Sequence, residues 1–245
     1  MQMPLAKNKA INYAMVILFN IFLILISLWI MILPLAKNKS FYMMEFQKNN
    51  TVQITGYTEE ELDTIAQTII DFLYGKSDTM QVKINNQDVF SIQALKHMED
   101  VKDLFVLGKT AGWVVLCLFV LLGLYLFFNF KSLQRLIVRG SLFTLLGIGL
   151  IVIAIGIATL VDFDAMFVIF HRIIFPDPAK FNDAFFGYQS NYVEAPGIDN
   201  LMLIKILSIE FFTDFFLIVI AFVILVIAAW ILIITGINRK AKLLS

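Results

Sequence analysis

Residues 163–175 read FDAMFVIFHRIIF, and this stretch decides how the rest of the chain is interpreted. It directly follows a long apolar segment and places one of the chain's two histidines among phenylalanines. If the stretch is helical, one face holds an acid and an imidazole, since that face consists of Asp164, Val168, His171 and Phe175. The adjacent face is an aromatic stripe of Phe163, Phe167, Phe170 and Ile174. The pattern indicates either a site that handles lipid or an interfacial helix whose histidine is merely solvated.

The composition is that of an integral membrane protein. Hydrophobic residues make up 60% of the chain and charged residues 16%, whereas a soluble domain carries roughly 25% charged residues. The formal net charge of +0 gives no basis for a nucleic-acid partner. The single cysteine, Cys117, lies in an apolar run and is interpreted as a packing residue with an inert thiol.

Four apolar runs have the length that a ~30 Å hydrocarbon core requires, namely residues 13–33, 113–130, 140–160 and 211–237. A signal peptide is the alternative for the first run, but its apolar region would be only about 7–15 residues long. We therefore expect an uncleaved span that ends at Pro34, followed later by a tight basic turn over residues 131–139.

The polar segment 35–109 carries its own folding signals. Thr58 followed by Glu61 predicts a capping box, and the helix that it starts should close at Gly75. Residues 80–90 alternate weakly around two asparagines, which predicts a small hairpin, and Ser91 should cap a second helix. The segment is too small to be an independent catalytic domain, so we expect it to pack against the membrane as a cap.

Basic residues in the short connections predict the orientation. The positive-inside rule places one set of side chains in the cytoplasm: Lys131, Arg135, Arg139, Arg239, Lys240 and Lys242. Both termini are then cytoplasmic, and both histidines face outside. The predicted fold class is an all-α membrane protein, with four transmembrane helices and an extracytoplasmic cap in which a small mixed α/β element is allowed. The first span is expected within residues 1–34, and the first cap segment over 35–109. Spans two and three should lie within 110–161, the second cap segment over 162–209, and span four with the tail within 210–245.

The candidate chemistry is acid–base catalysis by His97 and His171. The chain has no GxSxG, GxxxxGK or HExxH motif. Acidic residues lie near each histidine, Asp100 after the first and Asp164 before the second. Histidine titrates near neutrality, so a pair can accept and donate a proton in one cycle. A metal site built from both histidines and an acid is the alternative, but local ligand spacing is missing, and we expect no metal or other cofactor.

Several stretches resemble the lipoprotein intramolecular transacylase family, Lit. They are GYTEEE at 56–61, HMEDVK at 97–102, FHRIIF at 170–175, LIK at 203–205 and FFTD at 211–214. The resemblance covers nearly the whole chain, including the four-span layout. Three positions depart from the family pattern: Ala94 replaces an acid, Phe181 a tryptophan and Ser208 a proline.

The resemblance implies an enzyme that moves the sn-2 acyl chain of a diacylglyceryl lipoprotein onto the α-amine of its own N-terminal cysteine. His97 and His171 would be the acid–base pair. The substrate-orienting candidates are Asp100, Lys102, Phe163, Asp164, Phe167, Phe170, Arg172 and Phe175. The phenylalanines would confine the substrate and exclude water, and holding amine and ester in reach would supply much of the catalysis.

Two other functions remain open on the sequence. An outer-leaflet lipid or lipoprotein esterase would use the same histidines to activate water, and a non-catalytic sensor or assembly protein would use the cap to bind a partner. The expected partners are bacterial lipoproteins and membrane lipid, and the expected location is the bacterial plasma membrane, as a monomer with its active site facing outside.

Overall fold

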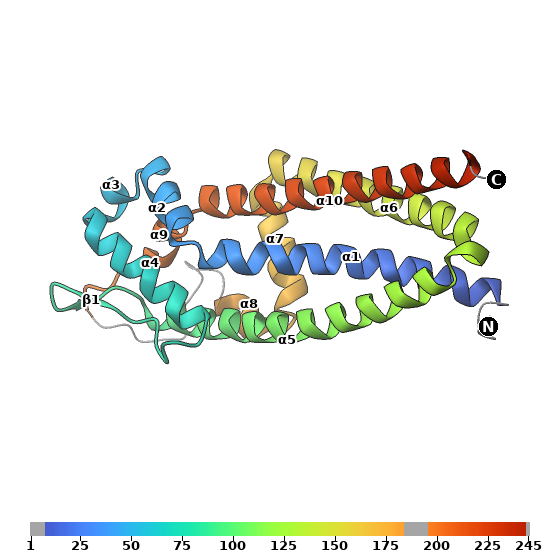
Figure 1. The fold of residues 1–245 in the computed structure, drawn as a ribbon. Helices are drawn as coiled ribbons and strands as arrows, with labels where there is room; N and C mark the ends of the chain where they lie inside the picture. The colour runs from blue at the N-terminus through green and yellow to red at the C-terminus, as the bar shows by residue number, and fades with distance from the viewer. Residues whose placement is uncertain (1–7, 184–195, 244–245) are drawn as a thin grey trace. The chain divides into compact units, whose positions relative to one another are not determined.

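The computed structural model describes residues 8–183 and 196–243, so residues 184–195 of the expected second cap segment lie outside the description. Four long helices dominate the chain (Figure 1): α1 (Lys9–Lys37), α5 (Ile92–Phe128), α6 (Phe130–Val161) and α10 (Ile209–Leu243). Each contains a segment long and apolar enough to cross a membrane. This confirms the predicted class, a multi-pass helical membrane protein with four spans.

The chain divides into two compact units. The first, here called the span unit, comprises Met1–Ile32, Lys109–Ile157 and Leu217–Ser245. The second, here called the histidine unit, comprises Leu33–Gly108 and Ala158–Phe216. Both histidines belong to the histidine unit, so the candidate site lies within a single compact unit.

Apolar packing and a few buried hydrogen bonds hold the span unit together. The rings of Phe19 and Phe119 stack with centroids 4.5 Å apart. The buried Asn20 donates to the Ser141 hydroxyl at 3.0 Å, joining α1 to α6. Such interhelical hydrogen bonds satisfy polar groups that lipid cannot. Cys117 is exposed on the surface of α5, so its predicted packing role is wrong.

The break between α5 and α6 is a single residue, Asn129, and not the expected turn over residues 131–139. The Asn129 side chain is buried and donates to the Tyr125 carbonyl at 2.9 Å, while its own carbonyl accepts from the Ser132 backbone at 3.1 Å. Because the break is one residue long, the basic residues Lys131 and Arg135 lie inside α6.

The first helix also differs from the expectation, because Pro34 lies inside α1 and the helix ends at Lys37. Proline lacks an N–H and so removes one hydrogen bond of the helix, but one further turn follows it. Asn38 then caps α2 (Lys39–Lys48), its side chain accepting from the Ser40 backbone.

Shorter elements of the histidine unit follow the predicted signals closely. Helix α3 (Thr51–Thr55) precedes α4 (Glu59–Leu73), whose capping box between Thr58 and Glu61 is present as predicted. A hairpin of β1 (Lys83–Ile84) and β2 (Gln87–Asp88) turns at Asn85 and Asn86, with φ of 51° and 64°. Both values lie in the left-handed region that two-residue hairpin turns require.

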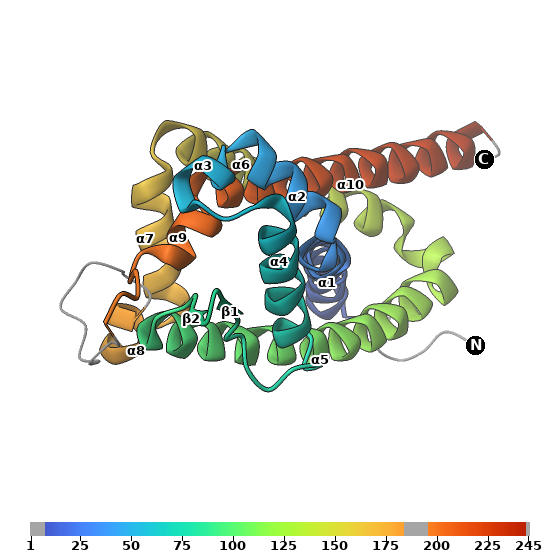
Figure 2. The ribbon, with the colours of Figure 1, turned by 90° about the vertical axis from the view of Figure 1, so that its left-hand side faces the viewer.

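The short helices of the histidine unit pack against one another. Helix α2 packs on α3 and α4, and α3 packs on α9 (Met202–Ile206), as Figure 2 shows. Ser91 caps α5 by accepting from the Ala94 backbone at 3.1 Å. The expected cap helix after Ser91 and the second span are therefore one continuous helix, α5, and His97 lies in its second turn.

Candidate active site

Helix α7 (Phe163–Ile174) forms over the stretch that the sequence singled out. The Asp162 side chain accepts from the Ala165 backbone at 2.9 Å and caps the helix. At the other end, the Phe175 N–H donates to the His171 carbonyl at 2.7 Å. His171 therefore lies in the last turn of a short helix with a defined start and end.

The fold brings His97 of α5 and His171 of α7 together. Their ring centroids are 5.9 Å apart, and the rings are inclined by 35°. Phe175 completes the group, with its ring centroid 5.6 Å from that of His97 and 5.8 Å from that of His171. His97 is 8% exposed and His171 5% exposed. The two predicted imidazoles thus form one buried pair.

A backbone hydrogen bond determines the tautomer of His171. Its Nδ1 lies 2.8 Å from the Phe167 carbonyl oxygen, which can only accept, so Nδ1 carries a proton. In the neutral ring the basic lone pair is then on Nε2. Burial lowers the pKa of His171 from its ordinary value of 6.5, and the hydrogen bond to Phe167 opposes that shift in part. His171 is therefore a neutral imidazole with a basic Nε2 near pH 7.

The aromatic wall extends beyond α7 onto α10. The Phe167 ring packs on His171, with centroids 3.9 Å apart, and on Phe212 at 5.9 Å. Phe216 lies 5.5 Å from Phe170 and 6.3 Å from Phe163. Phe212 and Phe216 were not predicted as site residues, although both lie in the aromatic run FFTDFF at 211–216.

The two predicted acidic residues have different surroundings. Asp100 forms an ion pair with Lys180 of α8 (Pro178–Asp183), a residue that the sequence analysis did not select. Asp164 is exposed in the first turn of α7. Among the side chains that the structure describes, no three from His, Cys, Asp or Glu could together hold a metal ion.

The predicted basic residues have structural contacts of their own. Lys102 donates to the Ser77 carbonyl at 3.1 Å, and its Nζ lies 4.3 Å from the centroid of the Phe72 ring. Arg172 is exposed, and its Cζ lies 5.4 Å from the centroid of the Phe181 ring. These contacts fix Lys102 to α4 and the residues that follow it, and they direct Arg172 toward α8.

The three departures from the family pattern have local explanations. Ala94 is buried one turn before His97, where an acid would need a partner. Phe181 provides the ring against which Arg172 lies. Ser208 accepts from the Phe211 backbone at 3.3 Å, so its hydroxyl caps α10.

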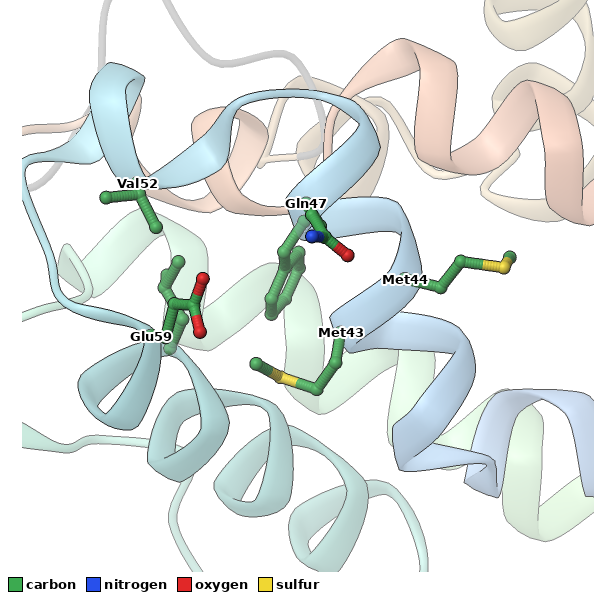
Figure 3. Close-up of a pocket in the computed structure, with 7 residues that line it drawn as sticks. Met43, Met44, Gln47, Val52 and Glu59 are labelled. Carbon is green, nitrogen blue, oxygen red and sulfur yellow. The ribbon is translucent and has the colours of Figure 1, made fainter.

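A pocket of about 190 Å³ lies elsewhere in the histidine unit (Figure 3). Its lining residues come from α2, α3 and α4: Met43, Met44, Phe46, Gln47, Val52, Glu59 and Leu62. Met43 and the Glu59 carboxylate point toward one another across it. Neither histidine lines this pocket, so it does not belong to the paired-histidine site.

The fold and the site together define a multi-pass membrane protein with a buried histidine pair on an aromatic wall. The chain belongs to the lipoprotein intramolecular transacylase (Lit) family, whose sequence pattern matches residues 15–180 and so covers both histidines. Membership makes it an enzyme of the transacylase class. No curated protein sequence matches the chain.

Solved structures show the same fold. The membrane-integral lipoprotein intramolecular transacylase Lit from Bacillus cereus superimposes with a TM-score of 0.69 at 17% identity, over 97% of this chain and 100% of that one. Two variants of that protein, with arginine or alanine in place of a histidine, give TM-scores of 0.66 and 0.63 at 18% identity. They cover 97% and 96% of this chain, and 95% and 97% of their own.

Proposed function

We propose that this enzyme moves the sn-2 acyl chain of a diacylglyceryl lipoprotein onto the α-amine of the lipoprotein's own N-terminal cysteine. The observation that carries the proposal is the pair of buried imidazoles of His97 and His171, 5.9 Å apart. The transfer needs one proton removed from nitrogen and one delivered to oxygen, and two adjacent histidines supply both.

In the proposed reaction the neutral amine attacks the ester carbonyl, forming the C–N bond. His171 accepts the proton that the nitrogen loses, because its Nε2 is the basic atom. The proton that His171 has accepted is delivered, across the neighbouring His97 imidazole, to the departing glycerol oxygen as the C–O bond breaks. Both imidazoles begin and end neutral, so the reaction needs no cofactor and no enzyme nucleophile.

The aromatic wall is proposed to hold the acyl chains and to keep water from the ester. Amine and ester belong to one molecule, so confinement of that molecule supplies much of the rate. We propose Phe163, Phe167, Phe170 and Phe175 as its contacts, extended by Phe212 and Phe216. Arg172 and Asp164 are exposed near its ends and are proposed to orient the polar part of the lipopeptide.

We propose that the histidine unit faces outside, with residues 35–109 and 162–209 extracytoplasmic and both termini cytoplasmic. The basic residues near the α5–α6 break and at the end of α10 support this orientation. The enzyme is proposed to act as a monomer in the bacterial plasma membrane, with lipoproteins and lipid, but no nucleic acid, as its partners.

The test is to incubate purified enzyme with a diacylglyceryl lipopeptide in detergent without phospholipid and to sequence the product by tandem mass spectrometry. Intramolecular transfer leaves the mass unchanged and produces an amide-linked chain. An esterase would lower the mass by one acyl chain, and an acyltransferase that uses a lipid donor would raise it.

The control is the same lipopeptide with its amine acetylated. It must remain unchanged, because the nucleophile is blocked. Loss of an acyl chain from the blocked peptide would show that water reaches the ester, and would replace the transacylase proposal with an esterase.

A further inference from the structure

The short helix α8 contacts both helices that carry the histidines. Its Lys180 pairs with Asp100 of α5, and its Phe181 ring lies beside Arg172 of α7, with Cζ 5.4 Å from the ring centroid. Asp100 lies three residues after His97, and Arg172 is the residue next to His171. Helix α8 therefore contacts each histidine helix within one turn of its imidazole.

Both connections from α8 to the histidines are short and stiff. On α5, three residues separate His97 from Asp100, a rise of about 4.5 Å along a continuous helix. On the other side, Pro176 and Pro178 restrict the chain between His171 and Lys180. Asp177 caps α8, since its side chain accepts from the Ala179 backbone at 2.9 Å. Lys180 is therefore joined to the helix that carries His171 by a short, conformationally restricted connection.

The electrostatic surroundings favour the pair of Lys180 with Asp100. The Asp100 side chain is 15% exposed and that of Lys180 48%, so the carboxylate is largely removed from water. The hydrogen bond that Lys180 donates to Asp100 raises the pKa of Lys180, and the charges of Asp103 and Asp177 add to the effect. Lys180 thus lies among three carboxylates, and Asp100 is the one that it contacts.

We propose that α8 is a clip that fixes the separation of the two imidazoles, with Asp100 and Lys180 as its positioning residues. The proposal rests on the proposed function, in which His97 and His171 exchange a proton through one substrate. Asp100 then acts through α8 on the geometry of the pair and does not orient an imidazole directly. Small errors in the position of reacting groups reduce rates strongly, so loosening the clip should lower kcat with little effect on KM.

The test uses charge reversal, because it separates a lost pair from a damaged fold. Asp100→Lys and Lys180→Asp each place like charges together and should each lower kcat roughly three- to tenfold. The double variant restores the pair in the opposite sense and should recover most of the rate. Asp100→Asn gives a milder loss and serves if a reversal variant is not inserted.

A matched control is available one turn away. Lys96 and Glu99 form an exposed ion pair at 2.8 Å between two residues of α5. Lys96→Glu with Glu99→Lys changes the same charges close to His97, and neither variant nor the swap should alter kcat.

A second measurement reads the imidazoles without the reaction. The chain has two histidines, so selective ¹⁵N-histidine labelling gives NMR signals from this pair alone. Each single reversal should shift the ring signals of both histidines, and the double variant should return them toward wild type. The NMR measurement still tests the clip if the acyl-transfer proposal fails, because the histidine signals depend only on the relative placement of the two rings.

Two results would overturn the clip. One is a double variant whose loss equals the product of the single losses, since the two charges would then act independently. The other is a loss of kcat in the single variants with histidine signals unchanged, because the residues would then act on something other than the imidazole pair.

Discussion

The ring of Phe167 lies against the imidazole of His171, with centroids 3.9 Å apart, and the carbonyl of the same Phe167 accepts a hydrogen bond from His171 Nδ1 at 2.8 Å. One residue thus sets both the solvation and the tautomer of the histidine. The ring excludes water, and the carbonyl directs the basic lone pair to Nε2.

This relationship predicts the titration of His171. Burial lowers its pKa below 6.5, so the ring should stay neutral in conditions where a solvated histidine is half protonated. Phe167→Ala removes the ring but keeps the carbonyl, and the pKa should rise toward 6.5. Ile173→Ala, at a position 71% exposed on the same helix, is the control and should leave it unchanged. Histidine NMR titration measures both, and an unshifted pKa in Phe167→Ala would contradict the desolvation argument.

The same shift predicts how stability depends on pH. The unfolded chain protonates His171 near pH 6.5, whereas the folded chain resists protonation to a lower pH. The contribution to stability is therefore fully present above about pH 6.5 and is lost progressively as the pH falls through the folded pKa. Thermal unfolding in detergent between pH 7.5 and 5 should show the decrease, and His171→Asn should show less of it.

Catalysis should depend on both histidines. His97→Ala and His171→Ala should each lower the rate by about 10²–10⁴-fold, the usual contribution of acid–base catalysis, while the protein still inserts. The lipopeptide mass assay measures the loss. Cys117→Ala should have no effect, since the thiol is exposed on α5 in the span unit and has no role in the proposed reaction. A near-normal rate in either alanine variant would show that this histidine is structural.

Packing in the span unit predicts a sensitive glycine. A Cβ at Gly112 would lie 2.2 Å from Trp29 Nε1, because α1 approaches α5 closely there. Gly112→Ala should therefore destabilise the protein by about 1–3 kcal/mol, through displacement of a bulky ring. Gly147→Ala is the matched control, since a Cβ there meets nothing within 4 Å. Equal melting temperatures for the two variants would contradict this packing.

Orientation is tested by reporter fusions. A fusion after Asn85 should be active only outside the cytoplasm, and one after Ser132 only inside, as the distribution of short-loop charges predicts. A cytoplasmic signal at Asn85 would place the histidine unit on the wrong side of the membrane for the proposed reaction.

Local signals in the sequence were sufficient for local structure. The capping box at Thr58, the hairpin at Asn85 and Asn86, and the four apolar spans all formed as predicted, because each depends on residues close together in the chain. Helix ends were harder to predict. Pro34 lies inside α1, where it removes one hydrogen bond of the helix without ending it. Asn129 alone divides α5 from α6, because its side chain donates to the Tyr125 carbonyl at the break.

The sequence by itself provided the two candidates for acid–base chemistry, since His97 and His171 are its only histidines. Tertiary structure alone decided that the two rings meet, that Phe212 and Phe216 complete the wall, and that Asp100 pairs with Lys180. The physical reason is distance along the chain. Periodicity describes neighbours within one helix, whereas contacts between α5, α7, α8 and α10 depend on how separate helices pack.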